Sequence, residues 1–201
     1  MRSVLHIGSG PRGIHRLHPI FQAGWREVRL DLDPSVEPDI VCSTADMRAH
    51  VASETFDAVW SSHNIEHLYD HEVPRAFAEI VRVLKPDGFF LVRCPDLETV
   101  LEAALRDGLE STAYVSPAGP ITPLDMLFGH RASVARGNAF MAHRTGFTDI
   151  RLGRLLLEAG FAHVSTKRAS GFDLWAAAMM PQANVQECLT TLAMTGLSFT
   201  E

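Results

Sequence analysis

Apolar and polar positions along the chain form short apolar runs that alternate with longer stretches of helical spacing. The apolar runs predict seven strands, over residues 3–7, 28–31, 40–42, 56–61, 89–94, 163–167 and 174–180. The amphipathic stretches predict four helices, over residues 15–23, 72–83, 97–106 and 149–159, the last of which ends at Gly160. Strands and helices that alternate in this way predict a layered α/β fold with a mainly parallel sheet.

The stretch over 107–147 follows neither pattern. It is rich in Gly, Pro, Thr and Ser and is too long for an ordinary connection, which is typical of a lid or a binding loop. We therefore expect one domain over 1–180 with an inserted lid or acceptor segment at 107–147, followed by a helical tail at 181–201. No apolar run approaches the length of a membrane span, so we expect no membrane partner.

The first predicted strand leads directly into a glycine-rich turn with the pattern GxGxxG, in which the glycines are Gly8, Gly10 and Gly13. Glycines there allow a tight turn, a close approach of a ligand to the backbone, and close packing of the next helix. Asp31 follows roughly 20 residues later, where a carboxylate can accept hydrogen bonds from both ribose hydroxyls. These features predict a nucleoside-containing cofactor and fit a nicotinamide-dependent dehydrogenase as well as a transferase.

A second motif separates these two classes. Residues 82–92 read as a helix end, a Lys-Pro-Asp-Gly turn in which Gly88 is expected to need a positive φ, and an apolar strand. With the glycine turn, Asp31 and residues 56–62, this segment resembles the class I S-adenosylmethionine-dependent methyltransferases, and the type-11-like members most closely. The resemblance covers residues 3–106. It implies a doubly wound, Rossmann-like, mainly parallel sheet with helices on both faces and an antiparallel last strand.

The resemblance also implies that the cofactor is S-adenosylmethionine and assigns residues to each part of it. By position in the family's motifs these are Gly8, Ser9, Gly10 and Gly13 for the methionine moiety, Asp31 for the ribose, Asp46 and the backbone N–H of Met47 for the adenine, and Ser62 beside the sulfonium. Asp33 is the alternative carboxylate for the ribose. One departure from the family pattern is His6, which occupies a position that is often acidic.

Candidate catalytic and acceptor-binding residues complete this interpretation. Transfer of a methyl group depends mainly on alignment, but an O or N nucleophile can need a base, and His63 and His143 are the candidates because imidazole titrates near neutral pH. The segment 107–147 is rich in arginine, and a guanidinium can clamp a phosphate or carboxylate. We expect His130, Arg131 and Arg144 to bind a small anionic acceptor; a solvated basic face is the alternative.

Residues 63–67, His-Asn-Ile-Glu-His, also match HxxEH, the inverted zinc-protease signature. A zinc protease needs both histidines on one helical face. Because His63 directly follows an apolar strand, we expect it in a loop, off the helical face of His67, and we predict that the chain holds no stoichiometric zinc or other metal. Glu66 and His67 are expected to pack or cap within the loop.

Composition limits the remaining classes. The net charge of −6 and the pI near 5.9 give no indication of a nucleic-acid partner. Three cysteines without a CxxC predict buried, reduced thiols in a cytoplasmic protein. The sequence thus predicts an enzyme that moves a methyl group from S-adenosylmethionine to an O or N of a small acceptor. The alternatives are a non-catalytic S-adenosylmethionine-binding module and a nicotinamide-dependent dehydrogenase. The sequence identifies neither the acceptor nor the oligomeric state.

Overall fold

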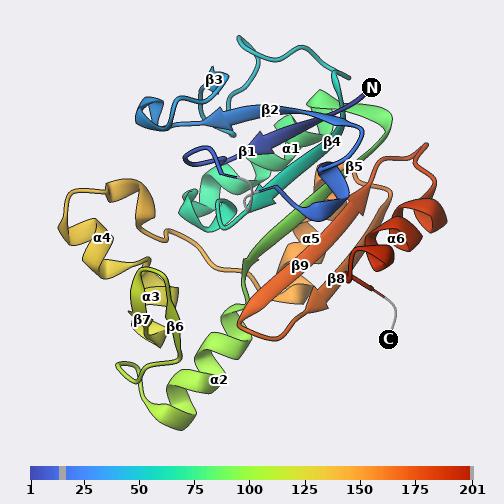
Figure 1. The fold of residues 1–201 in the computed structure, drawn as a ribbon. Helices are drawn as coiled ribbons and strands as arrows, with labels where there is room; N and C mark the ends of the chain where they lie inside the picture. The colour runs from blue at the N-terminus through green and yellow to red at the C-terminus, as the bar shows by residue number, and fades with distance from the viewer. Residues whose placement is uncertain (14–16, 200–201) are drawn as a thin grey trace.

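Seven strands form one sheet in the order β3-β2-β1-β4-β5-β9-β8 in the computed structural model, which describes residues 1–13 and 17–199 (Figure 1). The strands are β1 (Arg2–Ile7), β2 (Trp25–Asp31), β3 (Ile40–Val41), β4 (Phe56–Ser62), β5 (Leu84–Pro95), β8 (His163–Arg168) and β9 (Asp173–Met179). Strands β1 to β5 are parallel, whereas β9 runs antiparallel to both β5 and β8. The predicted doubly wound sheet with an antiparallel last strand is confirmed.

Two cores cover the two faces of this sheet. Helices α1 (Val73–Val83) and α5 (Asp149–Ala159) pack against one face, with Leu5 and Ile7 of β1 in the same core. Val4, between them in sequence, belongs to the core on the other face, with Phe21 and with Leu192 of α6 (Val185–Met194). Successive side chains of a strand point to opposite faces, so one buried strand serves both layers.

Three of the four predicted helices are confirmed, as α1, α2 (Leu97–Asp107) and α5. The helix predicted over 15–23 is wrong where it can be checked, because the structure has only a 3-10 turn there, Pro19–Phe21; residues 15 and 16 lie outside the described residues. Pro19 explains the difference. The residue before a proline is driven toward extended backbone, and His18 has φ −60° and ψ 143°.

The segment predicted as a lid is folded. It contains a hairpin of β6 (Tyr114–Ser116) and β7 (Gly119–Ile121), helices α3 (Pro123–Phe128) and α4 (Arg131–Ala135), and a 3-10 turn, Ala139–Met141. Val100 of α2, Ile121 and Met126 form a small core of their own. Figure 1 shows α3 and α4 on the side of the sheet at which β1, β4 and β5 end. The segment therefore lies at the edge of the sheet where doubly wound folds bind their ligands.

The tail predicted as helical contains α6, and Leu192 of this helix is fully buried in the core that includes Trp60 and Met179. The described part of the tail therefore packs as part of the domain. No helix in the described residues is long and apolar enough to cross a membrane.

The Lys-Pro-Asp-Gly motif differs from its prediction. Residues 84–95 form one strand whose pairing with β4 is irregular between Phe56 and Ala58, and Gly88 has no positive φ. A Cβ at this position would lie 3.0 Å from the carbonyl oxygen of Asp57 and 3.1 Å from that of Lys85. Gly88 is needed because backbones approach closely, and the predicted positive φ is wrong.

This packing predicts that Gly88→Ala lowers the free energy of unfolding by about 1–3 kcal/mol, because two backbone carbonyls must move. Gly153→Ala is the matched control. Gly153 lies inside α5, and its added Cβ would meet only the methyl of Thr166 at 3.5 Å, an ordinary contact. Because glycine is a poor helix former, the control should stabilise the chain by up to about 1 kcal/mol. Urea unfolding measures both values; equal effects of the two changes would contradict this account of Gly88.

Candidate active site at the carboxyl edge of the sheet

The glycine turn leaves β1 at the carboxyl edge of the sheet. Gly8 and Gly10 have φ of 62° and 58°, in the left-handed region, and Ser9 is buried between them. A Cβ on Gly8 would lie 2.3 Å from Cγ of Asn64, so the loop after β4 packs directly on this turn. Gly13 has neither a positive φ nor a neighbour that a Cβ would meet. The backbone conformation of the turn therefore explains why glycine stands at positions 8 and 10.

Asp31, at the end of β2, is bound to the same turn. Its Oδ2 accepts a hydrogen bond from the Gly10 N–H at 2.8 Å, and its Oδ1 accepts one from the Asp33 N–H at 2.9 Å. Each carboxylate oxygen retains a lone pair for a further donor. The Asp33 carboxylate instead caps a 3-10 turn by accepting from the Ser35 N–H at 2.9 Å. Asp31, and not Asp33, is the carboxylate at the glycine turn.

The other predicted cofactor residues differ in whether their polar groups already have hydrogen-bond partners in the protein. Asp46 is exposed after β3. The Met47 N–H donates to Oε2 of Glu79 at 2.9 Å, so this N–H has a protein partner, and the adenine contact expected for it stays a prediction. The hydroxyl of Ser62 accepts from Nε and Nη2 of Arg93 at 3.1 and 2.9 Å. Only Asp46 keeps an exposed side chain for adenine.

The position that is often acidic in the family holds an ion pair in this chain. His6 is buried, and its Nδ1 lies 2.7 Å from Oε1 of Glu27 on the neighbouring strand β2. A carboxylate is therefore present under the site, but it comes from a different strand.

The loop after β4 carries a buried carboxylate. His63 has φ 50° and precedes a 3-10 turn, Ile65–His67, so it lies outside the helical turn, as expected. Glu66 is 1% exposed, and within the described residues neither of its carboxylate oxygens has a hydrogen-bond partner at ordinary distance. It forms a long ion pair with His63, whose Nδ1 lies 3.4 Å from Oε1.

His63 does not fit the predicted role of a base near neutral pH. Its second ring nitrogen, Nε2, lies 3.3 Å from Oδ1 of Asp173, so both nitrogens face carboxylates. Burial lowers the pKa of His63, but the bonds to Asp173 and Glu66 raise it more, to about 9. A raised pKa favours the protonated ring, which has no lone pair to accept a proton from a nucleophile. The geometry therefore gives no support to His63 as a base, and its role stays a prediction.

Residues 141–147 run along this loop and are bonded to it. The carbonyl oxygen of Glu66 accepts from the N–H groups of Arg144 and Thr145, at 2.8 and 3.3 Å. Nδ1 of His67 lies 3.1 Å from the carbonyl oxygen of Ala142. These bonds bring His143 beside the loop, although the two segments are far apart in sequence.

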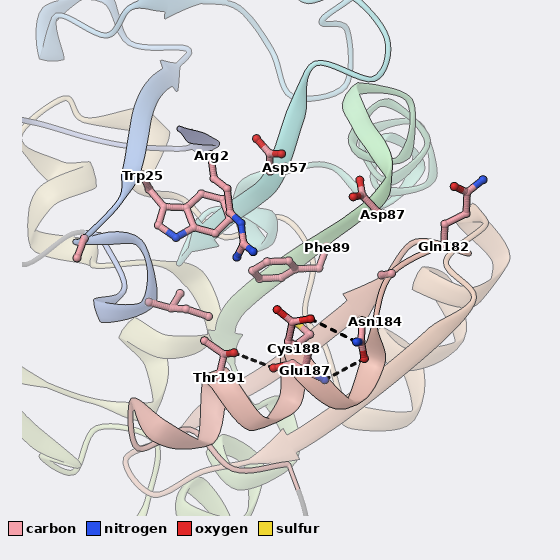
Figure 2. A pocket seen from close by; sticks show the side chains of 13 residues that line it. Arg2, Trp25, Asp57, Asp87, Phe89, Gln182, Asn184, Glu187, Cys188 and Thr191 are labelled. Atoms are coloured by element: carbon pink, nitrogen blue, oxygen red, sulfur yellow. Dashed lines mark hydrogen bonds between the residues drawn. The ribbon is translucent and has the colours of Figure 1, made fainter.

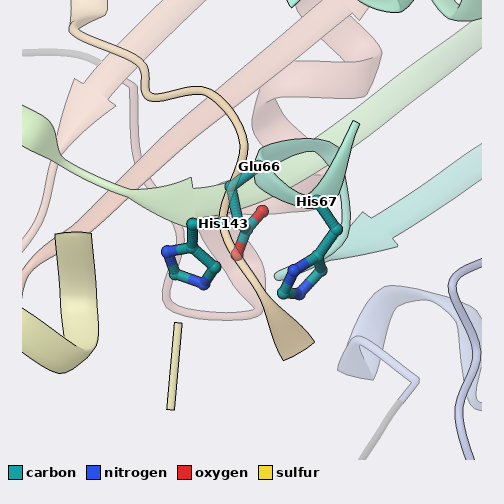
Figure 3. A group of neighbouring side chains, drawn as sticks. All are labelled: Glu66, His67 and His143. Atoms are coloured by element: carbon teal, nitrogen blue, oxygen red, sulfur yellow. The ribbon is translucent and has the colours of Figure 1, made fainter. Parts of the chain in front are cut away.

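His143 lies close to both His67 and Glu66. Its ring contacts the His67 ring edge to face, with centroids 4.9 Å apart, and its Nδ1 lies 2.8 Å from the carbonyl oxygen of Met126. Burial lowers the pKa of His143, which favours the neutral ring. Figure 3 shows the Glu66 carboxylate beside the two imidazoles. The sequence motif contained Glu66 and His67, but nothing in it pointed to His143 as their neighbour.

The predicted acceptor-binding residues do not all reach one place. Arg131 Nε lies 3.0 Å from Oδ1 of Asp125 at the start of α4, and Arg131 does not line the pocket described below, so its substrate role stays a prediction. His130 stands at the N-cap of α4 without a capping bond from its side chain. Arg144 lies 4.4 Å above the Tyr69 ring and is the one predicted arginine that lines a pocket beside Glu66.

That pocket has a volume of about 230 Å³. Its polar lining includes Glu66, His143 and Arg144, and its apolar lining includes Leu97, Met126 and Phe128. A larger pocket of about 420 Å³ lies at the opposite end of the sheet, between the starts of β1, β2, β4 and β5 and helix α6 (Figure 2). Ligands of doubly wound sheets bind outside the carboxyl ends of the strands, so the smaller pocket is the candidate site.

Comparison with known families agrees with this geometry. Residues 5–92, which include the glycine turn, Asp31 and the loop with Glu66, match the model of a methyltransferase domain. Residues 5–92 therefore carry a methyltransferase domain. The match decides against a nicotinamide-dependent dehydrogenase. No curated protein matches the chain.

Solved structures share the fold of this methyltransferase at low identity. A protein from Pyrococcus horikoshii OT3 is 19% identical with a TM-score of 0.61, and the match covers 90% of this chain and 82% of that one. The Burkholderia thailandensis 1,6-didemethyltoxoflavin-N1-methyltransferase, determined with S-adenosylhomocysteine, is 16% identical with a TM-score of 0.51 and coverages of 89% and 70%. The match to the citrinin polyketide synthase CMeT domain is 14% identical with a TM-score of 0.57, and covers 90% of this chain but 46% of that one.

Proposed function

We propose that this methyltransferase transfers the methyl group of S-adenosylmethionine to an O or N atom of a small acceptor that binds in the pocket beside Glu66. The observation that carries the proposal is the position of this pocket. It lies at the carboxyl edge of the sheet, between the loop that packs on the glycine turn and the folded segment 107–147. An acceptor there would lie next to a cofactor held by the turn.

The residues at the turn fit the cofactor. Gly8 and Gly10, both in the left-handed region, add no side chains to the turn, so a ligand can approach their backbone. The Asp31 carboxylate beside the turn can accept further hydrogen bonds from ribose hydroxyls. Asp46 is exposed at the next strand end, where it can accept from the amino group of adenine. When bound, S-adenosylmethionine supplies a methyl group that its sulfonium makes electrophilic.

The pocket itself positions and desolvates the acceptor. Leu97, Met126 and Phe128 offer contact to an apolar body and exclude water. Glu66, whose carboxylate is buried, and His143 lie at the polar end, where the His143 ring can accept a hydrogen bond from a hydroxyl or an amine. Arg144 lies at the same pocket and can pair with an anionic group of the acceptor. Alignment of nucleophile, methyl and sulfur is the main contribution, worth up to about 7–11 kcal/mol in favourable systems.

The assignment of Asp31 predicts that Asp31→Asn weakens binding of S-adenosylhomocysteine at least tenfold, because hydrogen bonds to a charged group contribute about 1.5–3 kcal/mol. Asp33→Asn is the matched control, since asparagine also caps a turn, and it should change the affinity less than about twofold. Calorimetric titration measures both. A larger effect of Asp33→Asn, or no binding by the unchanged chain, would overturn this cofactor site.

The assignment of the pocket predicts methyl transfer to members of a panel of small phenols, amines and carboxylic acids, with labelled S-adenosylmethionine as the donor. His143→Ala should lower kcat/KM by about 100-fold or more, as expected for a group that contacts the nucleophile, without weakening S-adenosylhomocysteine binding. His163→Ala, an exposed histidine on β8 outside the residues that line the pocket, should transfer at the unchanged rate. Transfer by His143→Ala at that rate would place the acceptor elsewhere, and no transfer to any compound would favour a non-catalytic binding module.

A further inference from the structure

Glu66, His67 and His143 form a cluster whose chemistry methyl transfer does not by itself require. Each offers one ligand atom, and these atoms lie within 4.8 Å of one another (Figure 3). Two imidazoles and one carboxylate are the protein ligands of one type of catalytic zinc site, which leaves a further position open. The cluster joins the loop after β4 to the segment that covers it.

The Glu66 carboxylate is buried and has one long ion pair. It is 1% exposed, and within the described residues neither oxygen receives a hydrogen bond of ordinary length. Its ion-pair partner is His63, whose Nδ1 lies 3.4 Å from Oε1, beyond the roughly 2.7–2.9 Å of a charge-assisted hydrogen bond. Buried charges are normally paired or bound to a metal. A cation beside the two imidazoles would supply a closer partner.

The two imidazoles present the ring atoms that a metal needs. Nδ1 of His67 lies 3.1 Å from the carbonyl oxygen of Ala142, and Nδ1 of His143 lies 2.8 Å from that of Met126. A carbonyl oxygen only accepts, so each Nδ1 carries the hydrogen and each Nε2 keeps its lone pair. Histidines that bind metals commonly donate their other N–H to a carbonyl in this way. Both rings are therefore held in the tautomer of a ligand.

We propose that Glu66, His67 and His143 bind one zinc-class divalent cation whose open position faces the acceptor pocket. Imidazole nitrogens with a carboxylate suit zinc or cobalt, whereas magnesium and calcium prefer oxygen ligands. In a tetrahedral zinc site the ligand atoms are about 3.4 Å apart, so small side-chain rotations close the cluster around the ion. His63 is not a ligand, which is why this site differs from the HxxEH motif for which the sequence predicted no metal.

The role of the ion rests on the proposed function. Glu66 and His143 both line the acceptor pocket, so an acceptor hydroxyl can take the open position. A bound divalent cation lowers the pKa of such a hydroxyl and fixes its oxygen in place. His143 then acts as a ligand, and the ion makes a separate base unnecessary. The inferred acceptor class is a small molecule with a hydroxyl group that can bind a metal.

The test begins with the full chain after treatment with a chelator, without cofactor. Titration with zinc chloride should show one ion per chain. Glu66→Gln, His67→Ala and His143→Ala should each weaken binding at least about 100-fold, as loss of a ligand exceeds the effect of outer-sphere changes. His71→Ala, an exposed histidine of the same loop outside the cluster, is the matched control and should bind as tightly as the unchanged chain.

A second measurement needs no variant. With cobalt(II) chloride, the unchanged chain should show visible absorption of a four-coordinate site and two paramagnetically shifted Nδ1–H proton resonances, one for each imidazole. The proposal would be overturned if the chain bound no stoichiometric zinc, or if His71→Ala weakened zinc binding as much as the three ligand variants do. A cobalt spectrum without these resonances would also overturn it. S-adenosylhomocysteine binding is measured separately, so a chain that binds it but no zinc would disprove the metal site and leave methyl transfer standing.

Discussion

The backbone carbonyl of Glu66 holds the acceptor side of this methyltransferase together. It accepts hydrogen bonds from the N–H groups of Arg144 and Thr145, and His67 binds the carbonyl of Ala142 beside them. A buried backbone needs such partners, so the covering segment cannot leave the loop without exposing or orphaning them. The pocket, the position of His143 and the environment of the Glu66 carboxylate all depend on this contact. The same loop also packs on Gly8, which connects the acceptor side to the cofactor side.

The proposed site thus has two halves with different origins. The proposed cofactor half comes from the strand ends on both sides of the point where the strand order reverses, between β1 and β4, which is where doubly wound sheets bind ligands. The acceptor half comes from the loop after β4 and from residues 107–147, which form their own small core on α2. The sheet can therefore keep one cofactor site while the covering segment determines which acceptor fits. This division explains why family membership identifies the donor but not the acceptor.

The sheet and the long helices could be predicted because their signals are local. Apolar runs gave every strand of the main sheet, and α5 was predicted with its observed bounds. The short helices of the covering segment were missed, although Thr122 and Asp125 form a capping box that marks the start of α3. The glycine turn and Asp31 could also be found, since their spacing is set by one strand, one helix and the next strand.

The acceptor side could not be predicted in the same way, because its contacts join distant segments. The basic character of 107–147 suggested arginines that bind substrate, but Asp125 pairs with Arg131. His63 looked like a base, but Asp173, on the last strand of the sheet, faces its second nitrogen. Sequence spacing also gave no reason to place His143 beside Glu66. For His63 and His143 the partner lies far along the chain, whereas for Arg131 it lies six residues away, where the sequence pattern does not show that the two side chains pair.

The most direct test of this account is a crystal structure of the full chain grown with S-adenosylhomocysteine and zinc. The account predicts the ribose at Asp31, the homocysteine sulfur facing the pocket beside Glu66, and the ion bound by Glu66, His67 and His143. A ligand in the larger pocket at the opposite end of the sheet, or a sulfur that faces away from Glu66, would contradict the account.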